Sequence, residues 1–156
     1  MKSFYETMLN QIRKHHLEQI IVAIAKYSPY ILAIIYLMTL LYLFIISHEL
    51  LLLTILKPFI TFIFVTVLRK FINRPRPCIA FQIQPLIGHK QYQSFPSRHS
   101  ASAFAIAFAL FNVNFTLGLM TMILAFIVSL SRIFTGVHFI SDVIASFIIS
   151  FLIFII

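Results

Sequence analysis

The residue types best suited to chemistry lie in the polar stretch from Ser131 to Asp142, between two strongly apolar runs. His138 is followed four residues later by Asp142, which is the only aspartate in the chain. Residues four apart lie on the same face of a helix, so Asp142 can hydrogen-bond one ring nitrogen of His138 and leave the other available for attack. Arg132 lies just upstream, beyond a short Thr-Gly break, so the stretch is suited to holding an anion before a nucleophile.

A second cluster places four cations within eight residues at the end of another apolar run: Arg69, Lys70, Arg74 and Arg76. One interpretation is a positive cap that anchors a helix among lipid headgroups. The other interpretation is a set of guanidinium groups that bind phosphate oxygens in a bidentate manner. Taken alone, the cluster fits both interpretations equally.

A third cluster, Pro96-Ser97-Arg98-His99, opens the next apolar run. Ser97 suits the N-cap position of a helix, which would direct backbone N–H groups and the positive end of the helix dipole toward the polar side. That arrangement favours a bound anion. His99 is either a second catalytic group or a histidine that only tolerates the membrane interface.

The elements that must position these clusters follow from composition. The chain has 156 residues, of which 61% are hydrophobic and 10% charged, and its mean hydropathy is +1.00. A soluble domain of this size cannot bury so much apolar surface, and apolar runs of about 20 residues recur, so we expect an all-α, polytopic transmembrane helical bundle. The net charge of +8 then indicates the membrane surface or an anionic substrate rather than nucleic acid, and no obligate protein partner is inferred.

Residues 1–26 mix charged and apolar positions, and we expect them to form an interfacial amphipathic helix. Residues 27–156 are expected to form the transmembrane domain, with Pro29 marking a break or kink and Lys57-Pro58 interrupting the second span. The expected spans are residues 28–47, 50–69, 99–112, 115–134 and 138–156, with a tight turn at His48-Glu49. An odd number of crossings places the three polar clusters and residues 1–26 on one face of the bilayer.

Taken together and in this order, the three clusters resemble the type 2 phosphatidic acid phosphatase superfamily, which also includes vanadium haloperoxidases and bacterial acid phosphatases. The third motif of that family, Ser-Arg-x5-His-x3-Asp, is matched completely by Ser131, Arg132, His138 and Asp142. The resemblance covers about residues 28–156.

The first family motif, Lys-x6-Arg-Pro, corresponds to Arg69, Arg76 and Pro77. Arg69 stands where the family has lysine. This departure keeps the positive charge, although arginine and lysine bind phosphate with different geometry.

The second family motif, Pro-Ser-Gly-His, corresponds to Pro96, Ser97 and His99. Arg98 stands where the family has glycine, so the chain carries one more cation beside the expected phosphate site. We expect this arginine to help bind a second phosphate or a charged headgroup.

The resemblance implies a two-step phosphoryl transfer. His138, oriented by Asp142, attacks phosphorus and forms a phosphohistidine. His99 protonates the leaving oxygen and then activates water for hydrolysis. The residues expected to bind the substrate phosphate are Arg69, Arg76, Ser97, Arg98 and Arg132.

No metal and no other cofactor are expected. Two-metal phosphatases need several carboxylates, and this chain has four acidic residues in all. Only Asp142 falls within the motifs, because Glu6, Glu18 and Glu49 lie elsewhere in the sequence. The arginines would therefore supply the positive charge that a metal supplies in other phosphatases.

The expected substrate is a lipid phosphate or diphosphate, because almost no polar region remains to recognise a water-soluble molecule. The compact form with an N-terminal interfacial helix is similar to undecaprenyl-diphosphate phosphatases, with phosphatidylglycerophosphate, phosphatidic acid and lipid A phosphatases as alternatives. A non-catalytic membrane protein that binds anionic lipid, and a vanadate-dependent peroxidase, are alternatives of other classes. A pure binder needs cations but no oriented nucleophile, so His99, His138 and Asp142 together favour the phosphatase.

The expected location is the cell membrane, crossed several times, but two arguments disagree on orientation. Counting cations places the polar clusters in the cytoplasm. The family resemblance favours an extracytoplasmic active site. Because phosphate binding accounts for several of the cations, we expect the extracytoplasmic side.

Overall fold

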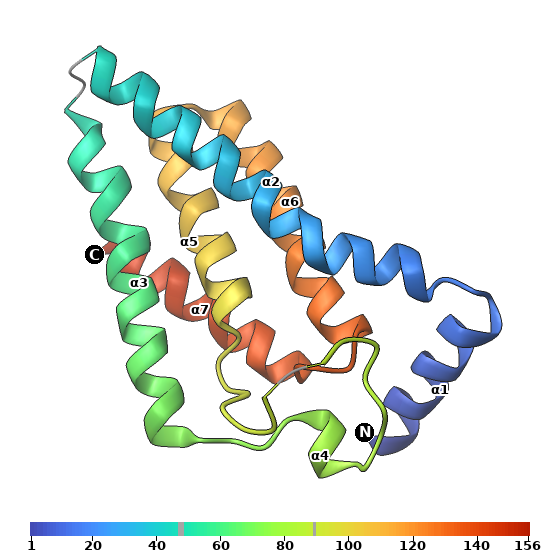
Figure 1. Ribbon diagram of the computed structural model, residues 1–156. Helices are drawn as coiled ribbons and strands as arrows, with labels where there is room; N and C mark the ends of the chain where they lie inside the picture. The colour runs from blue at the N-terminus through green and yellow to red at the C-terminus, as the bar shows by residue number, and fades with distance from the viewer. Residues whose placement is uncertain (47–48, 89) are drawn as a thin grey trace.

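The computed structural model describes residues 1–46, 49–88 and 90–156, which form helices and loops without a β-strand (Figure 1). The predicted all-α class is therefore confirmed. The helices are α1 (Lys2–Lys14), α2 (Glu18–Ile45), α3 (Leu50–Ile72), α4 (Pro77–Ala80), α5 (Arg98–Val113), α6 (Phe115–Phe134) and α7 (Ile140–Ile155). Among the described residues, three segments are long and apolar enough to cross a membrane, namely Glu18–Ile45, Leu50–Ala80 and Phe115–Phe134, and α7 is a shorter apolar helix.

The bounds of the expected spans after the first agree with those of helices α3, α5, α6 and α7 to within a few residues, and the number of membrane crossings stays a prediction. The tight turn expected at His48-Glu49 falls partly on residues 47–48, which lie outside the described residues. The chain is thus a multi-pass membrane bundle, and its loops are short except between α3 and α5.

Helix α5 lies at the centre of the bundle and packs against α3, α6 and α7, while α2 lies mainly along α6 (Figure 1). The buried face of α5 consists largely of alanine and phenylalanine: Ala101, Ala103, Phe104, Ala105, Ala107, Phe108 and Ala109. Small side chains let membrane helices approach closely, so the alanines explain the central position of α5. Phe104 and Phe108 fill the remaining space against Phe147 of α7, at ring-centroid distances of 5.1 and 5.6 Å.

The sequence predicts a break or a kink at Pro29, and the structure has no break there, because α2 runs through this residue. A proline inside a helix removes the N–H that would bond the carbonyl four residues earlier, here the carbonyl of Ala25. The Arg132 guanidinium, from α6, donates to this carbonyl through Nη2 at 2.6 Å. The helix stays continuous because a neighbouring helix supplies the missing donor.

Helix α3 is likewise continuous through Pro58, where the sequence predicts an interruption. The carbonyl that loses its helical donor is that of Thr54. The hydroxyl of Tyr36, from α2, donates to it at 2.9 Å. At both prolines, the backbone carbonyl that lacks a helical donor therefore accepts a hydrogen bond from a neighbouring helix.

The N-terminal segment differs from the single helix expected over residues 1–26. Helix α1 is separated from α2 by a turn in which His16 has a positive φ of 56°. Residues 18–26 therefore form the first turns of the long apolar helix. Helix α1 alone is the amphipathic element, and its buried residues are Tyr5, Leu9 and Ile12.

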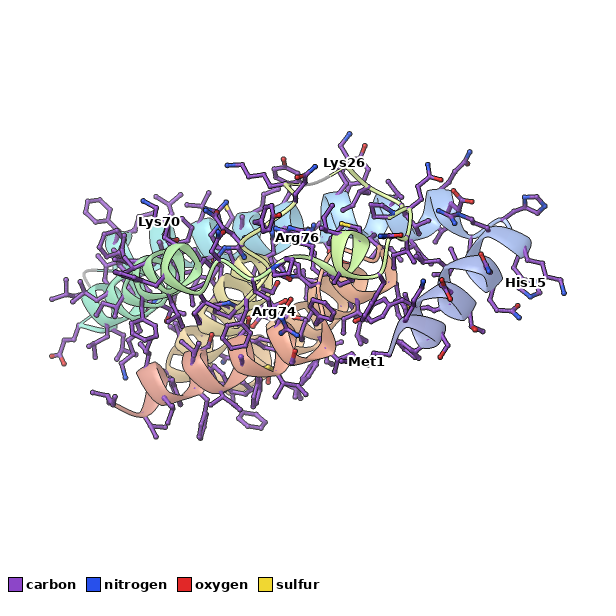
Figure 2. The ribbon with its side chains drawn as sticks, turned by 90° about the horizontal axis from the view of Figure 1, so that it is seen from below. Met1, His15, Lys26, Lys70, Arg74 and Arg76 are labelled. Carbon is purple, nitrogen blue, oxygen red and sulfur yellow. The ribbon has the colours of Figure 1, made fainter. Side chains whose placement is uncertain are left out.

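The polar segments gather at one end of the bundle (Figure 1). The end of α3, the starts of α5 and α7, the end of α6 and the helices α1 and α4 all lie there. Figure 2 views this end directly: Arg74 and Arg76 lie toward its middle, while His15, Lys26 and Lys70 lie toward its rim. The three clusters expected to meet on one face thus occupy the same end of the molecule.

Candidate active site

His138 and Asp142 form a buried pair at the start of α7, with exposed fractions of 1% and 0%. The Nδ1 of His138 lies 3.2 Å from Oδ2 of Asp142, in the contact that their spacing predicts. The histidine precedes the helix rather than lying on it. Oδ2 of Asp142 also accepts from the backbone N–H of Phe139 at 2.9 Å, so the carboxylate caps the exposed donors at the start of α7.

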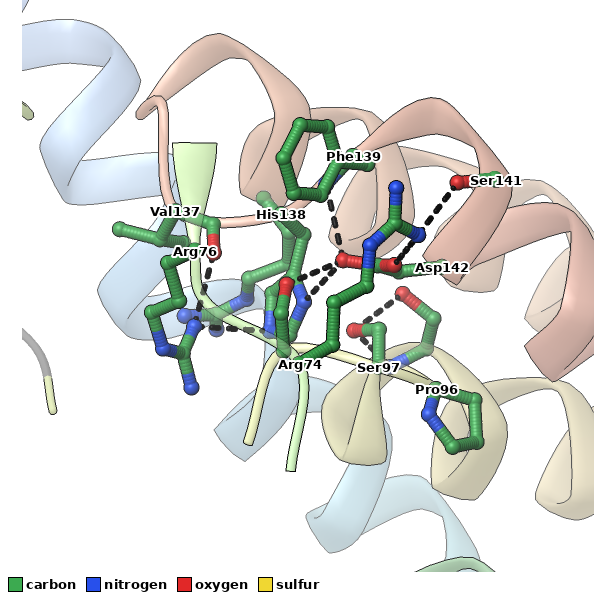
Figure 3. A network of polar contacts seen from close by, with 12 residues as sticks. Arg74, Arg76, Pro96, Ser97, Val137, His138, Phe139, Ser141 and Asp142 are labelled. Carbon is green, nitrogen blue, oxygen red and sulfur yellow. Dashed lines mark hydrogen bonds and ion pairs between the residues drawn. The ribbon is translucent and has the colours of Figure 1, made fainter. Parts of the chain in front are cut away.

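The surroundings of His138 assign its tautomer (Figure 3). Nη1 of Arg76 lies 3.2 Å from Nε2 of His138, and a guanidinium can only donate. Nε2 therefore carries the lone pair, and Nδ1 carries the proton directed at Asp142. This is the tautomer that a nucleophilic imidazole requires.

The imidazole of His138 is held in the neutral state. Burial is the largest influence and lowers the pKa of His138 to about 4. The hydrogen bond to Asp142 opposes this shift, whereas the positive charges of Arg76 and Arg69 reinforce it. Near neutral pH the side chain is therefore uncharged.

Two residues that sequence reasoning missed complete the surroundings of Asp142. Arg74 donates through Nη1 to Oδ1 of Asp142 at 2.9 Å and to Oγ of Ser141 at 2.9 Å. The hydroxyl of Ser94 donates to Oδ2 of Asp142. Arg74 belongs to the predicted basic cluster, but its partner lies 68 residues away in sequence, and no motif marks Ser94.

Arg69 and Arg76 are both anchored by loop carbonyls. Nη1 of Arg69 donates to Pro96 at 2.7 Å, and Nη1 of Arg76 donates to Val137 at 2.8 Å. The two side chains are 9% and 1% exposed. The structure thus brings the first motif to the second and third motifs, as the sequence predicts.

Two arginines retain buried donors that are unsatisfied. Among the described residues, Nε of Arg76 and Nε of Arg132 have no hydrogen-bond partner. Arg132 also donates a hydrogen bond from Nη2 to the carbonyl of Ala25 in α2, so only part of its guanidinium remains for other contacts. A buried N–H without an acceptor is costly, and an oxyanion bound here would satisfy such donors.

Ser97 joins the start of α5 to the start of α7. Its hydroxyl accepts from the Ser100 backbone at 3.4 Å and from the Ser100 hydroxyl at 2.9 Å, which makes Ser97 the predicted N-cap. Its backbone N–H donates to the Asp142 carbonyl at 3.2 Å, and its own carbonyl accepts from Ser146 at 2.9 Å. Capping therefore uses the Ser97 hydroxyl oxygen as an acceptor and does not use its O–H donor.

Arg98 and His99 lie on the wall of a cavity of about 360 Å³ between α2, α3 and α5. The other lining residues are mainly apolar: Pro29, Leu32, Ala33, Phe62, Ser102, Ala103 and Ile106. The guanidinium carbon of Arg98 lies 5.6 Å from the centre of the Phe62 ring. The predicted proton donor, His99, thus lies where the polar end meets an apolar cavity of the bundle.

Fold and site together define a class: an integral membrane bundle of helices whose polar end holds a buried histidine–carboxylate pair among arginines. Residues 47–156 match the model of the PAP2 superfamily, and the chain belongs to that superfamily. The resemblance inferred from the three motifs is therefore confirmed.

Two curated relatives are similar to part of the chain. It is 35% identical over 79 residues to undecaprenyl-diphosphatase BcrC of Bacillus subtilis (strain 168), a match covering 51% of this chain and 41% of that protein. It is 41% identical over 63 residues to bacitracin transport permease protein BcrC of Bacillus licheniformis, covering 40% of this chain and 31% of that protein. Each match spans less than half of the relative.

Two solved structures are similar over nearly the whole chain. LpxE of Aquifex aeolicus has a TM-score of 0.78 and 28% identity, covering 98% of this chain and 91% of that one. The PAP2-type phosphatidylglycerolphosphate phosphatase of Bacillus subtilis has a TM-score of 0.76 and 25% identity, covering 99% and 80%. The bundle is therefore a transmembrane fold already known in this superfamily.

Proposed function

We propose that the chain is a membrane lipid phosphatase that works through a phosphohistidine and needs no metal. The observation that carries the proposal is the geometry of His138, which is 1% exposed and has Nδ1 3.2 Å from Oδ2 of Asp142. Its other nitrogen, Nε2, lies beside the guanidinium of Arg76, where a phosphate oxygen would be attracted.

In the first step, Nε2 of His138 forms a bond to phosphorus as the bond from phosphorus to the leaving oxygen breaks. His99, in its protonated form, gives its proton to that oxygen. In the second step, His99 takes a proton from water, the water oxygen bonds to phosphorus, and the bond from nitrogen to phosphorus breaks. Arg69, Arg76, Arg98 and Arg132 balance the charge on the phosphate.

Positive charge in this site comes from arginines. Among the described residues, no three His, Cys, Asp or Glu side chains come together as a metal-ligand set. We therefore expect chelation with EDTA to leave phosphate release within about twofold of its original rate, since the guanidinium groups perform the electrostatic role.

Undecaprenyl diphosphate is the proposed substrate, supported by the relative named undecaprenyl-diphosphatase. Phosphatidylglycerophosphate is the second candidate, supported by the name of the Bacillus subtilis structural neighbour. We place the active site on the extracytoplasmic side of the cell membrane. Labelling of Cys78 by a membrane-impermeant thiol reagent tests this side: labelling only after lysis would contradict it.

The decisive experiment follows phosphate release from a small panel of lipid phosphates and diphosphates by protein purified in detergent. His138→Ala should lower the rate at least about a thousandfold, as loss of a covalent nucleophile does. Wild-type protein given lipid labelled in its terminal phosphate should retain the label after acid-free denaturation, and His138→Ala should not. Full activity in His138→Ala, or complete loss with EDTA, would refute the mechanism.

A further inference from the structure

Helix α1 contacts the loop that carries His138, although α1 lies outside residues 47–156, where the superfamily match falls. The hydroxyl of Tyr5 donates to the backbone carbonyl of His138 at 3.1 Å. Tyr5 is only 1% exposed, so this hydrogen bond is shielded from water. A residue near the start of the chain thus holds the main chain of the proposed nucleophile.

The contact from Tyr5 has a counterpart on the preceding peptide. Arg76 donates to the carbonyl of Val137 at 2.8 Å, and Tyr5 donates to the carbonyl of His138. The two donors therefore fix the peptide units on either side of the His138 α-carbon. Asp142 then fixes the rotation of the ring through Nδ1. Together these contacts determine where Nε2 lies.

The remainder of α1 supports the same loop by packing. Leu9 is 1% exposed, and its side chain lies 3.4 Å from the position that a β-carbon on Gly136 would occupy. Gly136 has φ of +75°, a conformation that glycine adopts readily, so the loop turns tightly beneath α1. The Tyr5 ring also contacts Phe81 and Phe139, at centroid distances of 5.9 and 6.2 Å.

We propose that Tyr5 is a positioning residue that sets the line of attack of His138 through the carbonyl of that histidine. This inference rests on the proposed phosphohistidine mechanism. Reacting atoms must approach within about 3–3.5 Å along a defined line, and a displacement of about 1 Å can cost about a hundredfold in rate. A hydrogen bond to the main chain of the nucleophile controls this displacement directly.

Tyr5 keeps its donor proton throughout the working pH range. Burial is the largest influence and raises the pKa of Tyr5 to about 12, while a hydrogen bond with the backbone of Ile140 acts in the opposite direction. The hydroxyl is therefore a permanent donor and takes no part in proton transfer. We expect the contribution of Tyr5 to be independent of pH between about 5 and 9, well below that pKa.

The test compares Tyr5→Phe, which removes only the hydroxyl, with Tyr30→Phe, a matched change on an exposed face of α2. Tyr5→Phe should lower kcat and the single-turnover rate of phosphohistidine formation about tenfold, with KM within about twofold and the same pH profile. Tyr30→Phe should leave all of these quantities unchanged. The expected shift in the thermal midpoint of Tyr5→Phe is a few degrees, because one buried acceptor loses its donor.

Leu9→Ala separates positioning from packing, since it weakens α1 without touching the hydrogen bond. It should lower the thermal midpoint by about 5 °C or more while lowering kcat less than Tyr5→Phe does. The proposal is overturned if Tyr5→Phe keeps kcat within twofold of wild type, or if kcat follows the thermal midpoint across both variants. Wild-type protein that releases no phosphate from any lipid would instead overturn the proposed function itself.

Discussion

The polar end of the bundle has two regions that differ in exposure: His138 and Asp142 form the first side, and Arg98 and His99 form the second. On the first side both side chains are buried, and the carboxylate accepts hydrogen bonds at both oxygens. On the second side Arg98 is exposed and His99 is partly buried, and both line the cavity between α2, α3 and α5. His138, the proposed attacking group, is enclosed by protein, whereas Arg98 and His99 border a cavity.

The difference corresponds to two requirements of the proposed reaction. An attacking nitrogen must be held within a fraction of an ångström, which rigid and dry surroundings provide. The leaving side must admit a lipid and release it, which requires space and exposed charge. We therefore expect changes around Asp142 to alter kcat, and changes at Arg98 to alter which lipid is accepted.

The largest effect is expected from Asp142→Asn. A neutral amide keeps the shape of the carboxylate, but it no longer holds the proton on Nδ1 of His138 or balances Arg74. We expect kcat to fall about a thousandfold, in the range seen when the carboxylate that orients a catalytic histidine is neutralised. Phosphate release measures this effect, with Glu49→Gln as the control in an exposed carboxylate. A loss of less than tenfold would show that the pair is not the source of reactivity.

A smaller loss of kcat, about thirtyfold, is expected from Arg74→Ala. The change removes the donor to Oδ1 of Asp142 and leaves a buried carboxylate partly unpaired. It also removes the guanidinium that lies 4.1 Å from the centre of the Phe139 ring. Lys70→Ala is the matched control, because Lys70 is an exposed cation of the same cluster. Equal activity losses in the two variants would mean that Arg74 contributes only general positive charge.

The fold class and the contact between His138 and Asp142 were predictable from local sequence. Apolar runs of about 20 residues determine the long helices, and the sequence predicts that His138 pairs with Asp142. The pairing is present, but its geometry is that of a residue before a helix and a carboxylate in the first turn, not that of two residues on one helix face. The continuity of α2 was not predictable, because the donor that compensates for Pro29 is Arg132, which lies 107 residues from Ala25. A local rule correctly detects the missing hydrogen bond but cannot find its distant replacement.

The site residues that the sequence did not predict were missed for the same reason. Tyr5, Arg74 and Ser94 meet the His138–Asp142 pair across separations of 133, 68 and 48 residues. Each has an ordinary local interpretation: an aromatic on an amphipathic helix, a cation at a helix end and a polar loop residue. Only the packing of α1 and of the long loop after α3 brings them to the pair.

On the open side of the site, Arg98→Gly tests substrate choice. Arg98 lies at the polar end of the cavity, where the second phosphate of a lipid diphosphate would lie if its chain enters the cavity. We expect the ratio of kcat/KM for a lipid diphosphate over the monophosphate of the same chain to fall about tenfold, the value of one charge-assisted contact. Arg98→Lys should recover part of this ratio. An equal loss on both lipids would assign Arg98 a general electrostatic role.

The smallest and most diagnostic effect concerns pH. Burial lowers the pKa of His138 from about 6.5 in an unfolded chain to about 4, so the folded state favours the neutral ring. The free energy of unfolding is therefore unaffected by this group above pH 6.5. It decreases as the pH falls toward 4, by at most about 3 kcal/mol. The thermal midpoint of the wild-type protein should therefore decrease as the pH is lowered from 7 to 5.

His138→Gln provides the reference for this pH effect, because glutamine does not titrate. Its thermal midpoint should decline less steeply over the same range, because the titration of His138 is removed and every other residue is unchanged. Parallel declines in the two proteins would mean that the ring of His138 is already charged or accessible to water in the folded state. The enclosed side of the site would then resemble the open side, and the kcat losses expected at Asp142 and Arg74 should shrink together.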